Sequence, residues 1–385
     1  MKKALFCHDH IFLEYEKDFY SPGKMTYDDI SRYFIFCHSV TIVSRSKEVD
    51  EIDRERYKSV TGPQATFIKF PNASSFNSLI FNRKLVELAK NIINGYDIVI
   101  VRLPSEIGNI FAKAAKELGV CILVEVVACV WDNLWNFGKL SAKIYAPLAF
   151  LRMKKNVKSG NFVHYVTSKF LQSRYPACQN ALTLSVSDVF IRERKNNTYK
   201  PSNDTCVNLC LIGSLDNKIK GIDIAIKAIS KLEEEVKLYI IGPGDPNQFQ
   251  SLLNELDIIE KIIFIGTLKD SEAVMNFLNE CIDIYIQPSY QEGMPRAVIE
   301  AMSCGIPCIV SNAGGMPEII QSDWIHSRGN SSELANKIMN LIKSPVLIGK
   351  TSSYNFNKSR EFLPEVLNKK RNDFYLNIKI GMVLL

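Results

Sequence analysis

Short, continuously apolar segments that alternate with helical patterns are the feature that most restricts the fold of this chain. In the first half, strands are predicted at 3–8, 40–45, 66–70, 97–102, 121–127 and 161–166. In the second half, they are predicted at 207–213, 236–242, 262–266, 283–287 and 307–311. Strands that are apolar on both sides need cover on both faces, which is typical of a parallel sheet between two layers of helices.

Helical patterns fill most of the gaps between these strands. They are predicted at 76–94 and 105–118, and then at 221–233, 247–258, 270–280, 296–304 and 331–343. Strand–helix alternation at this spacing indicates doubly wound α/β units. In such sheets, ligands bind beyond the carboxyl ends of the strands, so functional residues are expected there, facing a cleft between domains.

A polar stretch without periodicity, 189–204, separates the two sets of strands. At roughly 150 residues per domain, a chain of 385 residues accommodates two domains. We expect an N-terminal Rossmann-like domain over 1–195 and a C-terminal one over 196–365. The last segment, 366–385, is predicted to pack back on the N-terminal domain.

The net charge of +6 is unevenly distributed. Residues 139–195 carry eleven basic and two acidic side chains, a net charge of +9, which exceeds the total. A patch of this kind attracts polyanions or an anionic membrane face, although a basic helix face is also a common solvated surface.

Several classes of protein lack support in the sequence. No apolar run approaches about 18 residues, so no transmembrane helix is expected, and the polar N-terminus does not resemble a secretory signal. The ten cysteines are scattered along the chain, and we expect them to be free thiols in a reducing cytoplasm. Without zinc spacing or an Asp-x-Asp pair, we expect no metal or other cofactor. We also expect no nucleic-acid partner.

The segment 288–320 has the strongest functional pattern. It follows a predicted strand and opens a helix, with Gly293 and Pro295 where the loop becomes helical. We expect Pro295 in the first helical turn, where its missing N–H costs little. The N–H groups of Met294, Arg296 and Ala297 would then lack intrahelical partners and form an anion site. Glu292 and Glu300 flank these amides, and a carboxylate can accept two hydroxyl protons from a diol.

This segment resembles the Glu-x7-Glu motif of retaining GT-B glycosyltransferases, a family-4-like, group 1 class. The matching residues are Glu292, Gly293, Met294, Pro295, Glu300, Ala301, Met302, Gly305 and Pro307, followed by Gly314, Gly315, Met316, Pro317 and Glu318. The resemblance implies that Glu292 contacts the donor sugar and that Glu300 holds the ribose hydroxyls. It also implies a nucleotide-diphosphate sugar as donor substrate and no metal.

A second element, 211–229, resembles the diphosphate-binding loop of the same family. Gly213 and the pair Lys220–Gly221 match, but Ser214 stands where the family has an arginine. The resemblance implies that Lys220 neutralises the diphosphate. Lys218 is the candidate that replaces the missing arginine; the alternative is a solvated loop lysine.

Two segments of the first half resemble the polysaccharide-assembly branch of this family less closely. The loop that contains Gly23 and Lys24 follows the first strand, and the resemblance implies that it approaches acceptor and donor; the alternative is a surface loop without such a role. Residues 124–139 keep Trp131 and Asp132 of a strand-end motif. These two residues are candidates for contact with the sugar or the acceptor hydroxyl, and Asp132 is a candidate catalytic residue; core packing and helix capping are the alternatives.

Together these patterns predict a retaining glycosyltransferase that acts on a glycan or lipid-linked acceptor in bacterial capsule or lipopolysaccharide synthesis. The expected location is cytoplasmic, with peripheral contact between 139–195 and the anionic inner membrane face. Two alternatives remain open, a hydrolysing nucleotide-sugar epimerase and a non-catalytic GT-B scaffold.

Overall fold

The structure is a computed structural model that describes residues 2–21, 25–73, 82–194, 196–197, 199 and 206–384. The chain forms two compact units. Unit 1 comprises residues 1–186 and 368–385, and unit 2 comprises residues 187–367. Within the described residues, no helix is long and apolar enough to cross a bilayer.

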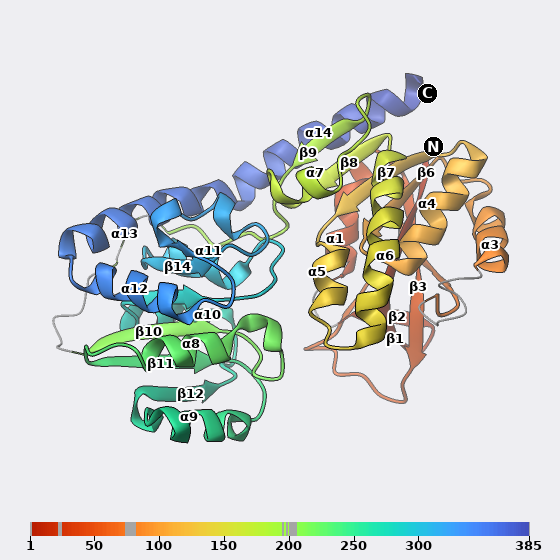
Figure 1. Cartoon of the computed structure of the whole chain (residues 1–385). Helices are drawn as coiled ribbons and strands as arrows, with labels where there is room; N and C mark the ends of the chain where they lie inside the picture. The colour runs from red at the N-terminus through yellow and green to blue at the C-terminus, as the bar shows by residue number, and fades with distance from the viewer. Residues whose placement is uncertain are drawn as a thin grey trace. The chain divides into compact units, whose positions relative to one another are not determined.

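Unit 1 contains a mainly parallel sheet of nine described strands (Figure 1). Its parallel part has the order β5-β3-β1-β6-β7-β8-β9, and β2 and β4 add an antiparallel extension. The strands are β1 (Lys3–Tyr15), β2 (Asp18–Ser21), β3 (Ser39–Glu48), β4 (Lys58–Ser59), β5 (Ala65–Lys69), β6 (Ile98–Leu103), β7 (Cys121–Val126), β8 (Phe162–Tyr165) and β9 (Leu182–Ser185).

The helices of unit 1 begin and end at recognisable sequence signals. For example, the Ser105 side chain caps the first turn of α4, and Gly119, with a φ of 69°, ends it. The helices are α1 (Tyr27–Ser31), α3 (Arg83–Ile93), α4 (Glu106–Leu118), α5 (Val130–Trp135), α6 (Leu140–Lys158) and α7 (Phe170–Arg174), with the short helix η1 (Arg32–Ile35). Most of the predicted helix 76–94 is present as α3, and residues 76–81 lie outside the described residues.

The first strand is longer than predicted. It was expected to end at His8, but β1 continues to Tyr15 and turns back into β2. Its register with β3 shifts between Cys7 and Ile11, so the polar residues His8, Asp9 and His10 sit at an irregularity inside the strand. These three polar residues interrupt the apolar run, which is why the predicted strand ended at His8.

The C-terminal helix α14 (Pro364–Leu384) contributes to the core of unit 1. Phe374, Tyr375, Ile378 and Met382 are buried in the same apolar cluster as Phe6. The Tyr375 ring lies 5.8 Å from the Tyr33 ring and 5.3 Å from the Phe36 ring, measured between centroids. Aromatic pairs at these separations add to the stabilisation from burial.

Unit 2 contains a parallel sheet of six described strands in the order β12-β11-β10-β13-β14-β15 (Figure 1). The strands are β10 (Val207–Ile212), β11 (Val236–Ile241), β12 (Ile262–Gly266), β13 (Ile284–Gln287), β14 (Cys308–Ser311) and β15 (Ile325–His326). Its α-helices are α8 (Ile222–Ile229), α9 (Gln250–Leu256), α10 (Ser271–Cys281), α11 (Arg296–Ser303), α12 (Ser331–Ile342) and α13 (Pro345–Ser359).

Six short helices of the 3-10 type complete the described elements of unit 2. They are η2 (Lys218–Lys220), η3 (Pro246–Phe249), η4 (Ile259–Lys261), η5 (Met316–Glu318), η6 (Ser322–Trp324) and η7 (Arg360–Phe362). Strand β10 pairs in parallel with both β11 and β13, so the loops that follow these strands leave the sheet at one edge. This adjacency brings together two segments that are about 70 residues apart in sequence.

Candidate active site

The loop after β10 positions Lys220. The Asn217 side chain accepts a hydrogen bond from the Ile219 N–H at 3.2 Å and so caps η2, which ends at Lys220. A side chain at Gly213 would place its Cβ 2.8 Å from Lys220 Cγ, so only glycine leaves room for the lysine stem. Ser214 is half-buried in the same loop, and Lys218 is exposed to solvent.

The loop after β13 places Glu292 against that lysine. The Lys220 ammonium donates a hydrogen bond to Glu292 Oε1 at 2.8 Å, and the Ser289 hydroxyl donates to the same oxygen at 2.7 Å. Behind them, the Gln287 amide donates to Ser289 Oγ at 2.9 Å, and the Tyr285 hydroxyl donates to Gln287. This chain of hydrogen bonds starts in the buried strand and fixes the carboxylate orientation.

A third loop, which follows β14, holds the backbone beside Glu292. Gly314 has a φ of 57°, and a Cβ there would lie 1.9 Å from the Glu292 carbonyl oxygen. The Gly315 N–H donates to the Gly293 carbonyl at 2.9 Å. Glycine at position 314 is therefore required both by its φ and by the close approach of the two chains.

Helix α11 begins at Arg296, directly after these contacts. The expectation that Pro295 lies in the first turn is wrong, because Pro295 has an extended ψ of 107° and precedes the helix. Helix geometry leaves the N–H groups of Arg296, Ala297 and Val298 without intrahelical partners. Met294 packs partly against the core of unit 2.

Glu300 lies one turn further along α11. Its side chain is 15% exposed, and its Oε1 lies 3.9 Å from the Arg296 guanidinium. Burial raises the pKa of Glu300, and the charge of Arg296 offsets part of that effect. The carboxylate is thus partly desolvated, which strengthens its hydrogen bonds to any hydroxyl that reaches it.

The candidates of the first half belong to unit 1. Gly23 and Lys24 lie outside the described residues. Trp131 and Asp132 lie on α5, where the Trp131 ring stacks on Trp135 at 5.3 Å between centroids. Asp132 is buried, and its Oδ1 lies 3.4 Å from the Arg174 guanidinium. The structure therefore joins Lys220 and Glu292 at one place and holds Asp132 in a separate ion pair.

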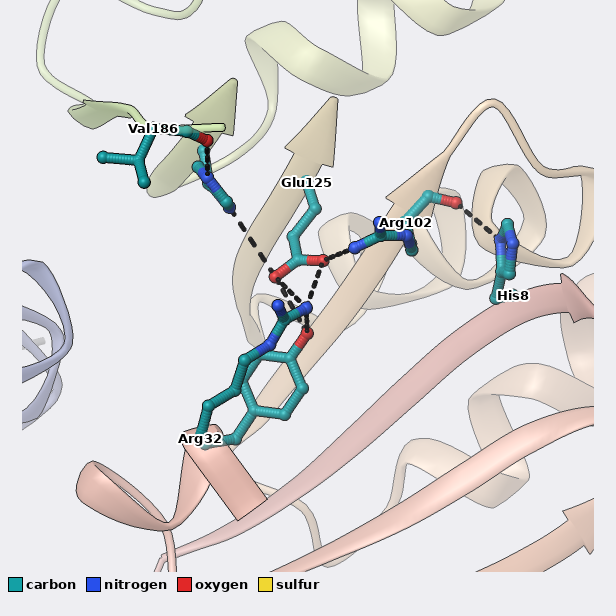
Figure 2. Close-up of polar contacts among 7 residues, drawn as sticks. His8, Arg32, Arg102, Glu125 and Val186 are labelled. Atoms are coloured by element: carbon teal, nitrogen blue, oxygen red, sulfur yellow. Dashed lines mark hydrogen bonds and ion pairs between the residues drawn. The ribbon is translucent and has the colours of Figure 1, made fainter. Parts of the chain in front are cut away.

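A buried charge cluster in unit 1 was not anticipated from the sequence (Figure 2). Glu125, on β7, is fully buried; Arg102 donates to its Oε2 at 2.7 Å, and the Tyr33 hydroxyl donates to its Oε1 at 2.8 Å. Arg32 lies 3.3 Å from the same carboxylate, and His164 lies 3.8 Å away. The signal was the one acid within the apolar run 121–127, because a carboxylate in a covered strand requires cationic partners.

This cluster reaches His8, at the irregularity of β1. The Arg102 carbonyl accepts a hydrogen bond from His8 Nδ1 at 3.1 Å, as Figure 2 shows. Burial and repulsion from Arg102 lower the pKa of His8 to about 4, so the imidazole is neutral at physiological pH. Burial by itself would raise the pKa of Glu125, but Arg32, His164 and Arg102 outweigh it and hold that pKa well below its usual range.

Comparison with known proteins identifies the family. Residues 194–359 match the family described as glycosyl transferases group 1. The chain is 32% identical over 390 residues to Protein CapJ of Staphylococcus aureus, an alignment that covers 97% of this chain and 98% of that protein. The chain belongs to the group 1 glycosyltransferases.

Two further comparisons concern parts of this glycosyltransferase and its fold. It is 31% identical over 141 residues to the O-antigen biosynthesis glycosyltransferase WclY of Escherichia coli, which is 35% of this chain and 38% of that protein. The crystal structure of Anabaena HepE in complex with UDP superposes with a TM-score of 0.65 at 16% identity and covers 100% of both chains. The glycosyltransferase thus has the predicted GT-B fold, with one Rossmann-like sheet in each unit.

Proposed function

We propose that this glycosyltransferase moves a sugar from a nucleotide-diphosphate sugar to a hydroxyl of a glycan or lipid-linked acceptor, with retention at the anomeric carbon. The observation that carries the proposal is the contact between Lys220 and Glu292, next to the open N-terminus of α11. A cation, free amides and a carboxylate at one edge of the sheet match a ligand that combines phosphates with hydroxyls.

Each residue has a definite part in this proposal. Lys220 and the first amides of α11 stabilise the charge that develops on the departing diphosphate. Glu300 accepts hydrogen bonds from the ribose hydroxyls, and Glu292 orients the donor sugar. Lys218, exposed in the same loop, supplies the second phosphate cation. No metal takes part, so turnover is expected to be insensitive to EDTA.

The acceptor side is proposed to lie in unit 1. Asp132 and Trp131 contact the acceptor in this reading, which requires the Asp132 carboxylate to leave its Arg174 partner. The likeness to WclY, whose name specifies O-antigen biosynthesis, supports a role in bacterial surface polysaccharide synthesis, and a cytoplasmic location goes with it. Membership of a transferase family favours sugar transfer over the two alternatives, a hydrolysing nucleotide-sugar epimerase and a non-catalytic scaffold.

Calorimetric titration with UDP-, GDP- and ADP-sugars tests the donor. We start with UDP-glucose, because HepE has been solved with that molecule. One donor is expected to bind the wild type, and Glu300→Gln is expected to weaken that binding about tenfold or more, because a charged acceptor is lost. Glu280→Gln, on an exposed position of α10, is the matched control. Binding of no donor would contradict the proposal, and nucleotide release without acceptor would favour the epimerase.

Donor binding is also expected to depend on pH through Glu300. Its raised pKa means that the carboxylate becomes protonated at a higher pH than an ordinary glutamate. Because the ribose hydroxyls need the ionised form as acceptor, affinity should fall as pH decreases through that raised value. Titrations between pH 8 and 5 measure this change, and Glu300→Gln should remove it. An identical pH dependence in the variant would show that another group is responsible.

A further inference from the structure

The solvent-facing side of α6 is apolar along most of its length. Leu140, Ile144, Leu148 and Leu151 expose 73%, 72%, 53% and 62% of their surface. With 3.6 residues per turn, these four side chains lie within a stripe about 80° wide. A helix on the surface of a soluble domain normally presents polar residues on that side. A contiguous apolar stripe in this position indicates a binding surface for a protein or a membrane.

The opposite side of α6 is already occupied by the core of unit 1, where α6 packs against α4 and α5 (Figure 1). Its buried residues are Ala146, Ala149, Met153, Asn156 and Val157. The helix is therefore apolar on two sides. This explains why basic and apolar residues do not separate into two faces in the sequence, although the exposed side is well defined in the structure.

Aromatic residues extend the stripe at its N-terminal end. Trp135, the last residue of α5, exposes 45% of its surface, and Phe137, in the connection to α6, exposes 66%. Lys143 Nζ lies 5.5 Å from the Trp135 ring centroid, and Lys139 Nζ lies 5.8 Å from that of Phe137. We call Trp135, Phe137, Leu140, Ile144, Leu148 and Leu151 together the α6 surface.

The charges around the α6 surface determine which partner fits. No Asp or Glu occurs between Asn133 and Ser187, whereas this range contains eight Lys and Arg residues. Lys155 and Lys158 are exposed and continue the stripe by helical spacing, and Lys139 and Lys143 flank its other end. A second copy of the chain docked on the same surface would bring like charges together. An anionic bilayer accepts both components, the apolar side chains among acyl chains and the lysines at the phosphates.

We propose that the α6 surface binds this protein to an anionic lipid bilayer, with α6 lying in the plane of the interface. The proposal rests on exposure and charge in unit 1 and does not depend on the donor site in unit 2. It narrows the membrane contact expected for 139–195 to six apolar side chains and their neighbouring lysines.

Vesicle flotation of the full chain tests the proposal. The wild type is expected to float with vesicles of phosphatidylglycerol and phosphatidylcholine and to bind pure phosphatidylcholine at least about tenfold less. The double variant Ile144→Glu/Leu148→Glu should bind the anionic vesicles at least about tenfold less than the wild type. Both replaced side chains are exposed, so folding should be preserved, and circular dichroism and the thermal midpoint check this. Val346→Glu, at an exposed position of α13, is the matched control and should bind like the wild type.

Trp135 provides a second readout in the same experiment. Its emission should shift to shorter wavelength and be quenched by brominated acyl chains when anionic vesicles are added, and Trp135→Phe should remove most of that response. Three outcomes would overturn the proposal: no flotation of the wild type, equal flotation of the double variant, or a dimer in sedimentation that the double variant abolishes without any vesicle binding.

Discussion

Replacement of Lys220 or Glu292 by alanine is expected to lower kcat/KM by about 10²- to 10³-fold, the usual effect of removing a preorganised charged group from a transition state. In the proposed mechanism, Lys220→Ala removes the cation beside the departing diphosphate. Glu292→Ala removes the carboxylate proposed to orient the sugar and also the partner that holds the lysine at 2.8 Å. Each substitution therefore disturbs the function of both residues.

The two single variants and the double variant separate a shared function from two independent ones. If the ion pair acts as a unit, the double variant should be about as impaired as the worse single variant, because the losses are not additive. The control is Lys227→Ala on α8, whose ammonium forms an exposed ion pair with Asp223 at 3.7 Å. Its kcat/KM should stay within about twofold of the wild type. Near-normal turnover in Lys220→Ala would refute the proposed diphosphate site.

Glu125→Gln is expected to lower the free energy of unfolding of unit 1 by about 3 kcal/mol. The amide has the same shape but removes the negative charge that Arg32 and Arg102 contact, and the two arginine side chains are only 23% and 18% exposed. Urea denaturation measures the effect. A Trp324→Phe background leaves Trp131 and Trp135, both in unit 1, as the fluorescent reporters.

The difference between Glu125→Gln and the wild type should depend on pH. Because folding depresses the pKa of Glu125, its stabilising contribution is complete above the ordinary value of 4.5 and is lost as pH falls through the folded value. The two proteins should therefore converge in acid. Glu117→Gln serves as the control, since its carboxylate pairs with Lys90 at the surface and should cost less than about 1 kcal/mol. Equal stability of Glu125→Gln and wild type at neutral pH would rule out this role of the cluster.

The sequence predicted the elements of the candidate site better than the contacts between them. The sequence segments around Lys220 and Glu292 indicated a loop followed by the start of a helix, because Gly and Pro have definite conformational preferences at such positions. The two side chains touch because β10 pairs with β13. The order of strands in a sheet cannot be predicted from the local conformational preferences of residues. The contact of Gly314 with the Glu292 carbonyl depends in the same way on a third strand.

The first half of the chain was predicted less completely, for two physical reasons. The irregularity in β1 places polar residues inside a strand, so the end of the apolar run ended the predicted strand at His8. The partners of Glu125 come from η1, β6 and β8, and no spacing rule joins such distant positions. The apolar neighbours of Glu125 could suggest that this acid is buried, but the sequence could not identify the cationic residues that pair with it.

The contribution of α14 to unit 1 has a consequence for biosynthesis. The segment that supplies Phe374 and Tyr375 is synthesised after every residue of unit 2, so the ribosome has translated residues 187–367 before unit 1 can close its core. Unit 2 is contiguous and can fold as soon as it emerges. Until α14 docks, Tyr33 and Phe36 both lack their aromatic neighbour Tyr375, and nascent chains stalled before residue 374 should be the species that chaperones retain.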